Sequence, residues 1–270
     1  MTSFSYLCIK DFKAFSSLWQ VFGSLPIRNL QQKENAGNFL VWLRPKGRDV
    51  HPMTSSIAVD LIVFDLDGTL ADTLPDLTAA ANFACRRLGL PERSPAAIRG
   101  MIGGGELKLI ERLVGPSHQD RVEECLQLYL DHYTRHNGEL TRLYPGVAET
   151  LARVSGKKLA VLSNKLQRLT QQTLEAIDIA RFFAAIRGGG AGLPLKPAPD
   201  PLLALTADLG VGPSRSLMVG DKIADITTGR EAGAFTAAVT YGYGDLDALT
   251  AASPDFLLAR FSQLPGILAG

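Results

Sequence analysis

The sequence Leu61-Ile62-Val63-Phe64-Asp65-Leu66-Asp67-Gly68-Thr69-Leu70 joins an apolar run to two carboxylates. A continuous apolar run is typical of a strand that is buried on both faces of a parallel sheet. Asp65 and Asp67 follow where this strand ends, and Gly68 permits a tight turn with the backbone close to a ligand. Taken alone, the same residues would also suit an ordinary surface turn. In an open parallel sheet, however, ligands bind at the carboxyl ends of the strands.

Later stretches repeat this pattern of an apolar run followed by polar residues. Further strands are expected at 159–162, 183–186, 217–219, 236–239 and 256–258, with helices between them at 145–155 and 201–209. Strands that alternate with helices predict an α/β fold, here a doubly wound, Rossmann-like parallel sheet. Asp65, Ser163 and Asp221 each come at the end of an apolar run, so we expect them at one edge of the sheet.

Residues 71–144 interrupt this alternation. Apolar residues recur there at helical spacing over 75–88, 95–101, 106–114 and 119–136. A crossover between parallel strands needs about a dozen residues and usually one helix. The segment is therefore predicted to be a separate helical cap domain, inserted into a core made of residues 53–70 and 145–270.

Residues 1–52 differ from the rest of the chain. They hold both tryptophans, Trp19 and Trp42, and frequent glycine and proline turn signals, but no catalytic constellation. Met53 leads directly into the first strand, so we expect the functional chain to begin near Met53 and the extension, whose role is unknown, to be dispensable and foreign to the native chain. An organellar targeting segment is the alternative, and Asp11 and Glu34 argue against it.

The composition excludes several functional classes. The formal net charge of the 270 residues is +1, which favours neither nucleic acid nor a membrane surface as a partner. The three cysteines are odd in number and lack ligand spacing, so we expect a reducing compartment, the cytoplasm. No apolar run approaches the roughly 18 residues of a membrane helix.

The polar residues suggest a metal site that binds phosphate. Asp65, Asp67, Asp221 and Asp225 would gather negative charges that, if unpaired, raise carboxyl pKa values and destabilise the fold. A divalent cation together with Lys196 would nearly neutralise them, and a set of oxygen ligands favours Mg²⁺. The Ser163 hydroxyl and the backbone amides of Ser163 and Asn164 can bind phosphate oxygens near a helix N-terminus.

In their order and spacing, these stretches resemble the four motifs of haloacid dehalogenase-like hydrolases. The motif residues are Asp65-Leu66-Asp67-Gly68-Thr69-Leu70, Ser163-Asn164-Lys165, Lys196-Pro197 and Gly220-Asp221 with Asp225, and the resemblance covers about residues 56–268. More narrowly, the chain is similar to the phosphoglycolate phosphatases at Tyr144-Pro145-Gly146-Val147, Lys196-Pro197-Ala198-Pro199-Asp200-Pro201-Leu202 and Thr240-Tyr241-Gly242-Tyr243-Gly244.

The resemblance implies a role for each motif residue. Asp65 would be the nucleophile that forms an aspartyl-phosphate, and Asp67 the general acid and then the general base. Ser163 and Lys196 would stabilise the transferring phosphoryl group. The metal site would consist of Asp65, Asp67 through its carbonyl, Asp221 and Asp225. The expected partner is a small phosphorylated metabolite, most simply 2-phosphoglycolate, and the expected assembly is a monomer or homodimer.

The remaining predicted contacts concern the substrate. Thr69 is expected to steady the nucleophile loop and, with Asn164, to contribute to substrate binding. A carboxylate on the substrate needs donors of its own. The glycines Gly103, Gly104 and Gly105 precede a predicted helix, where backbone amides and the helix dipole favour an anion.

One position departs from the family pattern. A serine or threonine commonly follows the Gly-Asp motif, whereas this chain has Lys222. We expect its side chain to point outward; pointing inward, it would weaken Mg²⁺ binding. Alternatives to a phosphoglycolate phosphatase remain open. They are a phosphatase or phosphomutase for another small sugar or nucleotide phosphate, and a catalytically weak protein that binds phosphate ligands.

Overall fold

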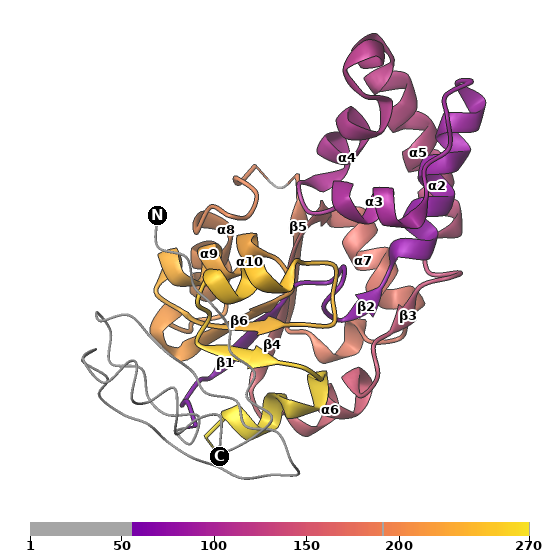
Figure 1. Cartoon of the computed structure of the whole chain (residues 1–270). Coiled ribbons are helices and arrows are strands. Elements are labelled where there is room, and N and C mark those ends of the chain that lie inside the picture. Colours follow the sequence, from indigo (N-terminus) through magenta and orange to yellow (C-terminus); the bar gives the residue numbers. More distant parts are fainter. Residues whose placement is uncertain (1–55, 191, 270) are drawn as a thin grey trace, which may run out of the picture. The chain divides into compact units, whose positions relative to one another are not determined.

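A six-stranded parallel sheet forms the centre of the fold. The computed structural model describes residues 56–190 and 192–269, and Figure 1 labels its elements. The strands lie in the order β5 (Ala185–Gly189), β4 (Lys158–Leu166), β1 (Leu61–Phe64), β6 (Ser216–Gly220), β7 (Phe235–Val239) and β8 (Phe256–Leu258). The predicted α/β fold class is confirmed. The chain proceeds from β1 to one edge of the sheet and then returns to the other side of β1, which places a topological switch point beside this strand.

Strand β1 is central and buried on both faces. Phe64 pairs with Val161 of β4 and with Val219 of β6, and all four residues of β1 are inaccessible to solvent. Ile62 and Phe64 belong to the core on one face of the sheet, whereas Leu61 and Val63 belong to the core on the other. This two-sided burial explains why the strand is a continuous apolar run.

Helices cover both faces of the sheet. Helix α6 (Val147–Arg153) and helix α7 (Gln167–Ala176) pack on the face of Phe64, and helix α8 (Asp200–Asp208) and the end of helix α9 (Ile223–Ala232) pack on the face of Val63. Helix α10 (Leu246–Ala251) begins after Asp245, whose carboxylate accepts a hydrogen bond from the Ala248 amide. Short 3₁₀ helices complete the core at Ala180–Phe182, Pro213–Arg215 and Phe261–Ile267.

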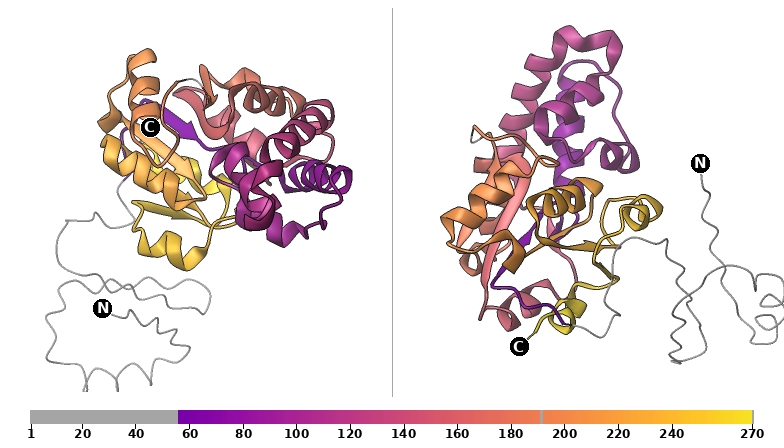
Figure 2. Two further views of the ribbon diagram at one scale, coloured as in Figure 1. Left: turned by 90° about the horizontal axis from the view of Figure 1, so that it is seen from above. Right: turned by 90° about the vertical axis from the view of Figure 1, so that its left-hand side faces the viewer.

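The inserted segment forms its own group of helices (purple to magenta in Figures 1 and 2), and their apolar cluster also includes Leu169 of α7. The helices are α2 (Leu74–Arg87), α3 (Pro95–Met101), α4 (Gly105–Val114) and α5 (Val122–His136). The expected start of the last helix at residue 119 was wrong, because Pro116–Arg121 forms a 3₁₀ helix and α5 begins after it.

A two-stranded antiparallel ribbon joins the cap to the core. Strand β2 (Ala71–Asp72) enters the cap, β3 (Arg142–Leu143) leaves it, and Asp72 pairs with Arg142. The buried Asp76 carboxylate accepts hydrogen bonds from the Thr141 hydroxyl and from the amides of Gly138, Leu140 and Thr141. Both chain passages are therefore fixed to each other beside the ribbon.

Strand β4 runs further than the sequence indicated. It continues through Leu166, so Ser163 and Lys165 lie inside the strand rather than after it, with a register shift between Leu162 and Leu166. The expectations for residues 1–52 lie outside the described residues. Within the described part of the chain, none of the helices combines the length and the apolar character needed to cross a membrane.

Candidate active site

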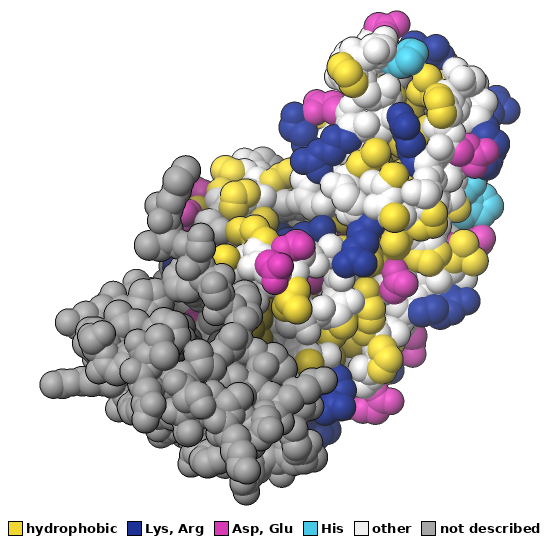
Figure 3. Space-filling view, in the orientation of Figure 1, with side chains coloured by type: hydrophobic (Ala, Val, Ile, Leu, Met, Phe, Trp, Pro, Cys, Tyr) yellow, Lys and Arg dark blue, Asp and Glu magenta, His cyan; other side chains and the backbone are white. Residues whose placement is uncertain are grey.

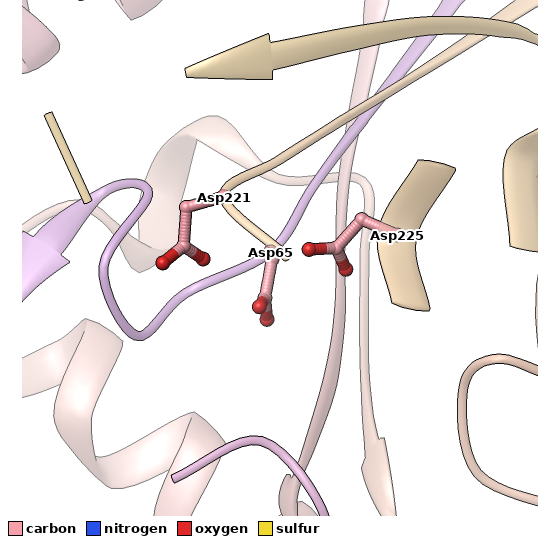
Figure 4. Close-up of side chains that lie close together, drawn as sticks. All are labelled: Asp65, Asp221 and Asp225. Carbon is pink, nitrogen blue, oxygen red and sulfur yellow. The ribbon is translucent and has the colours of Figure 1, made fainter. Parts of the chain in front are cut away.

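Three buried carboxylates meet at the carboxyl ends of the central strands. Asp65 follows β1, Asp221 follows β6 and Asp225 lies in the first turn of α9. One oxygen from each lies within 4.8 Å of the others, and Figure 4 shows Asp65 between its two neighbours. The predicted convergence of Asp65 and Asp221 therefore follows from the sheet topology, since β1 and β6 are adjacent parallel strands.

Burial and nearby negative charge raise the pKa values of Asp65 and Asp221. Burial, together with the charges of Asp65 and Asp225, raises the pKa of Asp221 to about 7. Burial likewise raises the pKa of Asp65 to about 6, against the lowering effect of Lys196. The Asp221 carboxylate accepts hydrogen bonds from the Tyr243 amide at 2.7 Å and the Thr69 hydroxyl at 3.3 Å. Thr69 is fully buried, and its hydroxyl donates to Asp221.

The turn after β1 requires a glycine at position 68. Gly68 has φ +86°, in the left-handed region, and a Cβ atom there would lie 2.4 Å from Asp221 Oδ2. Both the backbone conformation and the close approach of Asp221 therefore exclude a side chain.

Lys196 is the cation of the cluster. Its Nζ lies 3.0 Å from Asp65 Oδ1 and 2.7 Å from Asp225 Oδ1, and it donates to the Leu162 carbonyl at 2.7 Å. Burial alone would lower the pKa of Lys196, but Asp225 and Asp65 together raise it above its ordinary value. The Asn164 side chain bonds both the amide and the carbonyl of Lys196, at 2.8 and 2.9 Å. Lys196 is thus charged and held in place.

Asp67 points to a different partner. Its Oδ1 lies 2.7 Å from Lys165 Nζ and accepts a hydrogen bond from the Thr73 hydroxyl at 2.6 Å. Lys165 also donates to the Tyr133 hydroxyl of the cap at 2.8 Å. Sequence reasoning assigned Lys165 no role, although it stands two residues after Ser163 on a strand, and alternate residues of a strand share a face. That spacing was the available signal.

The part of the sequence that holds this site matches a known family. Residues 62–239 match the haloacid dehalogenase-like hydrolases. This chain belongs to that family. It is 37% identical over 206 residues to the phosphoglycolate phosphatase of Aquifex aeolicus, covering 76% of this chain and 94% of the relative. It is 36% identical to that of Vibrio parahaemolyticus, covering 78% and 96%.

Solved structures show the same fold. A predicted phosphoglycolate phosphatase from Haemophilus somnus 129PT superposes with a TM-score of 0.73 at 30% identity, covering 78% of this chain and 98% of that one. The expected resemblance to the family and to phosphoglycolate phosphatases is confirmed. The expectation that the protein is a hydrolytic enzyme is confirmed as well, and the relatives indicate a phosphatase.

In this haloacid dehalogenase-like hydrolase, the cap closes one side of the pocket. Gly103, Gly105 and Glu106 line it together with Asp65, Asp67, Ser163, Asn164, Lys165 and Lys196. The Gly103 carbonyl accepts a hydrogen bond from the Asn164 side chain at 2.8 Å. The Glu106 carboxylate accepts one from the Leu166 amide at 3.0 Å. Gly104 is the N-cap residue of α4. The predicted contact between this glycine loop and substrate stays a prediction.

The expectation that Lys222 points outward was wrong for this hydrolase. Lys222 lines the pocket, and its Cε lies 3.8 Å from where a Cβ of Gly103 would be. Its Nζ is 6.0 Å from the Tyr243 ring centroid, and none of the described acidic groups forms a salt bridge with it. Figure 3 shows further Lys and Arg side chains on the cap and where the cap meets the core.

Proposed function

We propose that this hydrolase is a Mg²⁺-dependent phosphatase that converts 2-phosphoglycolate to glycolate and phosphate through an aspartyl-phosphate. The observation that carries the proposal is the position of Asp65. Its Oδ1 accepts a hydrogen bond from the Leu66 amide at 2.7 Å and faces Lys196 at 3.0 Å. Among the described residues, Oδ2 has no hydrogen-bond partner, so it is free to attack phosphorus. Substrate identity is supported by the relatives named phosphoglycolate phosphatase, of which the chain covers most.

The reaction needs two steps that share one acid–base group. Asp65 Oδ2 attacks phosphorus while the ester oxygen leaves and takes a proton from Asp67. Asp67 then removes a proton from a water that attacks the same phosphorus, which releases Asp65 and phosphate. Lys165 and Thr73 hold the Asp67 carboxylate in the same pocket as Asp65. Lys196 and Ser163 would neutralise and bond the phosphoryl oxygens.

The donor set fits Mg²⁺. Three carboxylates within 4.8 Å supply only oxygen ligands, which suit this ion. Asp65, Asp221 and the Asp67 carbonyl would hold it. Asp225 would act indirectly, because its two oxygens already bond Lys196 Nζ at 2.7 Å and the Lys222 amide at 2.9 Å. When bound, the ion supplies positive charge to the phosphoryl oxygens.

The test is phosphate release from a panel of esters with and without Mg²⁺. The panel contains 2-phosphoglycolate, ethyl phosphate, glycerol phosphates, sugar phosphates, nucleoside monophosphates and an aryl phosphate. The proposal expects the highest kcat/KM for 2-phosphoglycolate and no turnover after removal of divalent ions. A higher kcat/KM for a sugar or nucleotide ester would favour the alternative phosphatases. Transfer of phosphate within a sugar would favour a mutase, and no turnover of any ester would favour a binding protein.

We propose the cytoplasm as the location of this protein and a monomer or homodimer as its assembly.

A further inference from the structure

Tyr129 of helix α5 carries a buried hydroxyl that has no hydrogen-bond partner among the described residues. Its side chain is 0% exposed and lines the pocket beside Glu106, Leu77 and Leu109. Within residues 56–190 and 192–269, Tyr129 Oη has no hydrogen-bond partner. A buried hydroxyl without a partner is destabilising and uncommon in native proteins. A group of this kind on a pocket wall indicates a partner that arrives with the ligand.

Tyr133 lies one helical turn from Tyr129 on α5, and its hydroxyl has a hydrogen-bond partner. The rings of Tyr129 and Tyr133 stack with centroids 5.7 Å apart, and Tyr133 is only 1% exposed. The Tyr133 hydroxyl accepts a hydrogen bond from Lys165 at 2.8 Å. The two residues share chemistry, helix and burial, but of the two only Tyr133 has a partner in the part of the chain that the structure describes.

Tyr129 lies toward the leaving-group end of the pocket. Burial raises its pKa well above the ordinary value, with further contributions from Tyr133, Glu106 and Asp67. The hydroxyl therefore keeps its proton near neutral pH and can donate. The nearby donors are already committed: Lys165 to Asp67 and Tyr133, and the Leu166 amide to Glu106. Tyr129 is therefore an uncommitted donor beside Glu106; Lys222, which also lines the pocket, forms no salt bridge among the described residues either.

We propose that Tyr129 Oη donates a hydrogen bond to the carboxylate of the leaving group and so selects esters that carry an oxygen acceptor there. The inference rests on the proposed function for the identity of that acceptor. Glu106 lines the same wall and repels an anion, although Lys165 offsets its charge. A substrate carboxylate therefore needs a donor at this place, and Tyr129 supplies one.

The experiment replaces only the hydroxyl, with Tyr129→Phe. Its effect is compared on 2-phosphoglycolate and ethyl phosphate, which share a two-carbon leaving group but differ in the carboxylate. A hydrogen bond to a charged acceptor predicts a loss of about 10- to 100-fold in kcat/KM for 2-phosphoglycolate. Ethyl phosphate should be hydrolysed as before. The melting temperature without substrate should rise by about 2–4 °C, because an unsatisfied hydroxyl is removed.

Tyr133→Phe is the matched control. It removes a bonded hydroxyl, so it should lower the melting temperature and reduce the hydrolysis of both esters alike through Lys165 and Asp67. An unchanged preference between the two esters in Tyr129→Phe would overturn the inference, and so would equal losses on both. If the proposed function is wrong, the wild-type protein itself will prefer an ester other than 2-phosphoglycolate. In that case the inference predicts that Tyr129→Phe hydrolyses this other ester no better than ethyl phosphate. If the variant still prefers the other ester over ethyl phosphate, the inference is overturned.

Discussion

The two ends of the pocket are built in opposite ways. At the carboxylate cluster, Lys196 contacts two carboxylates and a carbonyl, and Asp225 uses both of its oxygens on partners from the protein. At the cap end, Tyr129 has no partner among the described residues. One end is therefore nearly complete before substrate arrives, whereas the other is not.

We infer that the carboxylate cluster determines the type of reaction, whereas the cap end determines the choice of substrate. A preorganised charge arrangement stabilises a transferring phosphoryl group whatever alcohol carries it. Discrimination between alcohols comes from polar groups that remain unpaired when the wrong ligand binds. Substitutions at the cluster should therefore act on all esters, and substitutions at the cap end should act on some.

The largest effect is expected from Asp65→Asn. It removes the nucleophile while keeping the shape of the side chain, so phosphate release from every ester should fall by at least about 1,000-fold. Phosphate release with Mg²⁺ measures this loss, and circular dichroism controls for folding. Comparable rates in the wild-type protein and the variant would show that Asp65 is not the nucleophile, and would contradict the view that the carboxylate cluster acts on every ester.

Asp67→Asn should cost about 100- to 10,000-fold, because the leaving oxygen loses its proton donor. The loss should be smaller for an aryl phosphate, whose leaving group is more acidic and needs less protonation. The ratio of the two losses is the measurement. Equal losses on aryl and alkyl esters would contradict the assignment of Asp67 as general acid.

The third prediction concerns pH and Mg²⁺. In the metal-free protein, the pKa values of Asp65 and Asp221 are raised to about 6 and about 7. The folded state then binds more protons than the unfolded state, so these groups stabilise the fold at low pH and lose that effect as pH rises through about 6 to 7. Mg²⁺ replaces those protons, so the increase in melting temperature that it causes should be larger at pH 8 than at pH 5. Calcium-free buffers with and without Mg²⁺ provide the comparison, and an increase that does not depend on pH would argue against carboxylate ligands.

Lys222→Ser should have a modest effect. Removing one positive charge from the pocket should tighten apparent Mg²⁺ binding about threefold to tenfold. Titration calorimetry with Mg²⁺ measures this directly, and Lys108→Ser, at an exposed position of the cap, is a control for loss of a lysine. Unchanged affinity would mean that the Lys222 charge is screened from the carboxylates.

The smallest effect is expected from a chain that begins at Met53. Both ends of the pocket are made by residues after this position, so turnover per molecule and the preference between esters should match those of the full chain. An insoluble or inactive product would show that the extension supports the core.

The sequence predicted the features that neighbouring residues determine better than those that depend on contacts between distant segments. The apolar run of β1 and the carboxylates after it follow from neighbouring residues, because β1 is buried on both faces and its end lies at the switch point. The orientations of the Lys222 and Lys165 side chains were harder to predict, because they depend on the cap and on the irregular end of β4. The contact between Lys165 and Tyr133 joins strand β4 to helix α5, 32 residues apart in the sequence, and no local pattern specifies such a contact.

The ribbon that joins cap and core has a consequence for how such enzymes diversify. Asp72 and Arg142 are paired neighbours, so the chain leaves the core and returns to it at almost the same point. The cap is thus an excursion from a hairpin, and a short two-residue turn suffices to close that hairpin. Replacing the residues between Asp72 and Arg142 would exchange the whole cap while the order of the six core strands stays unchanged.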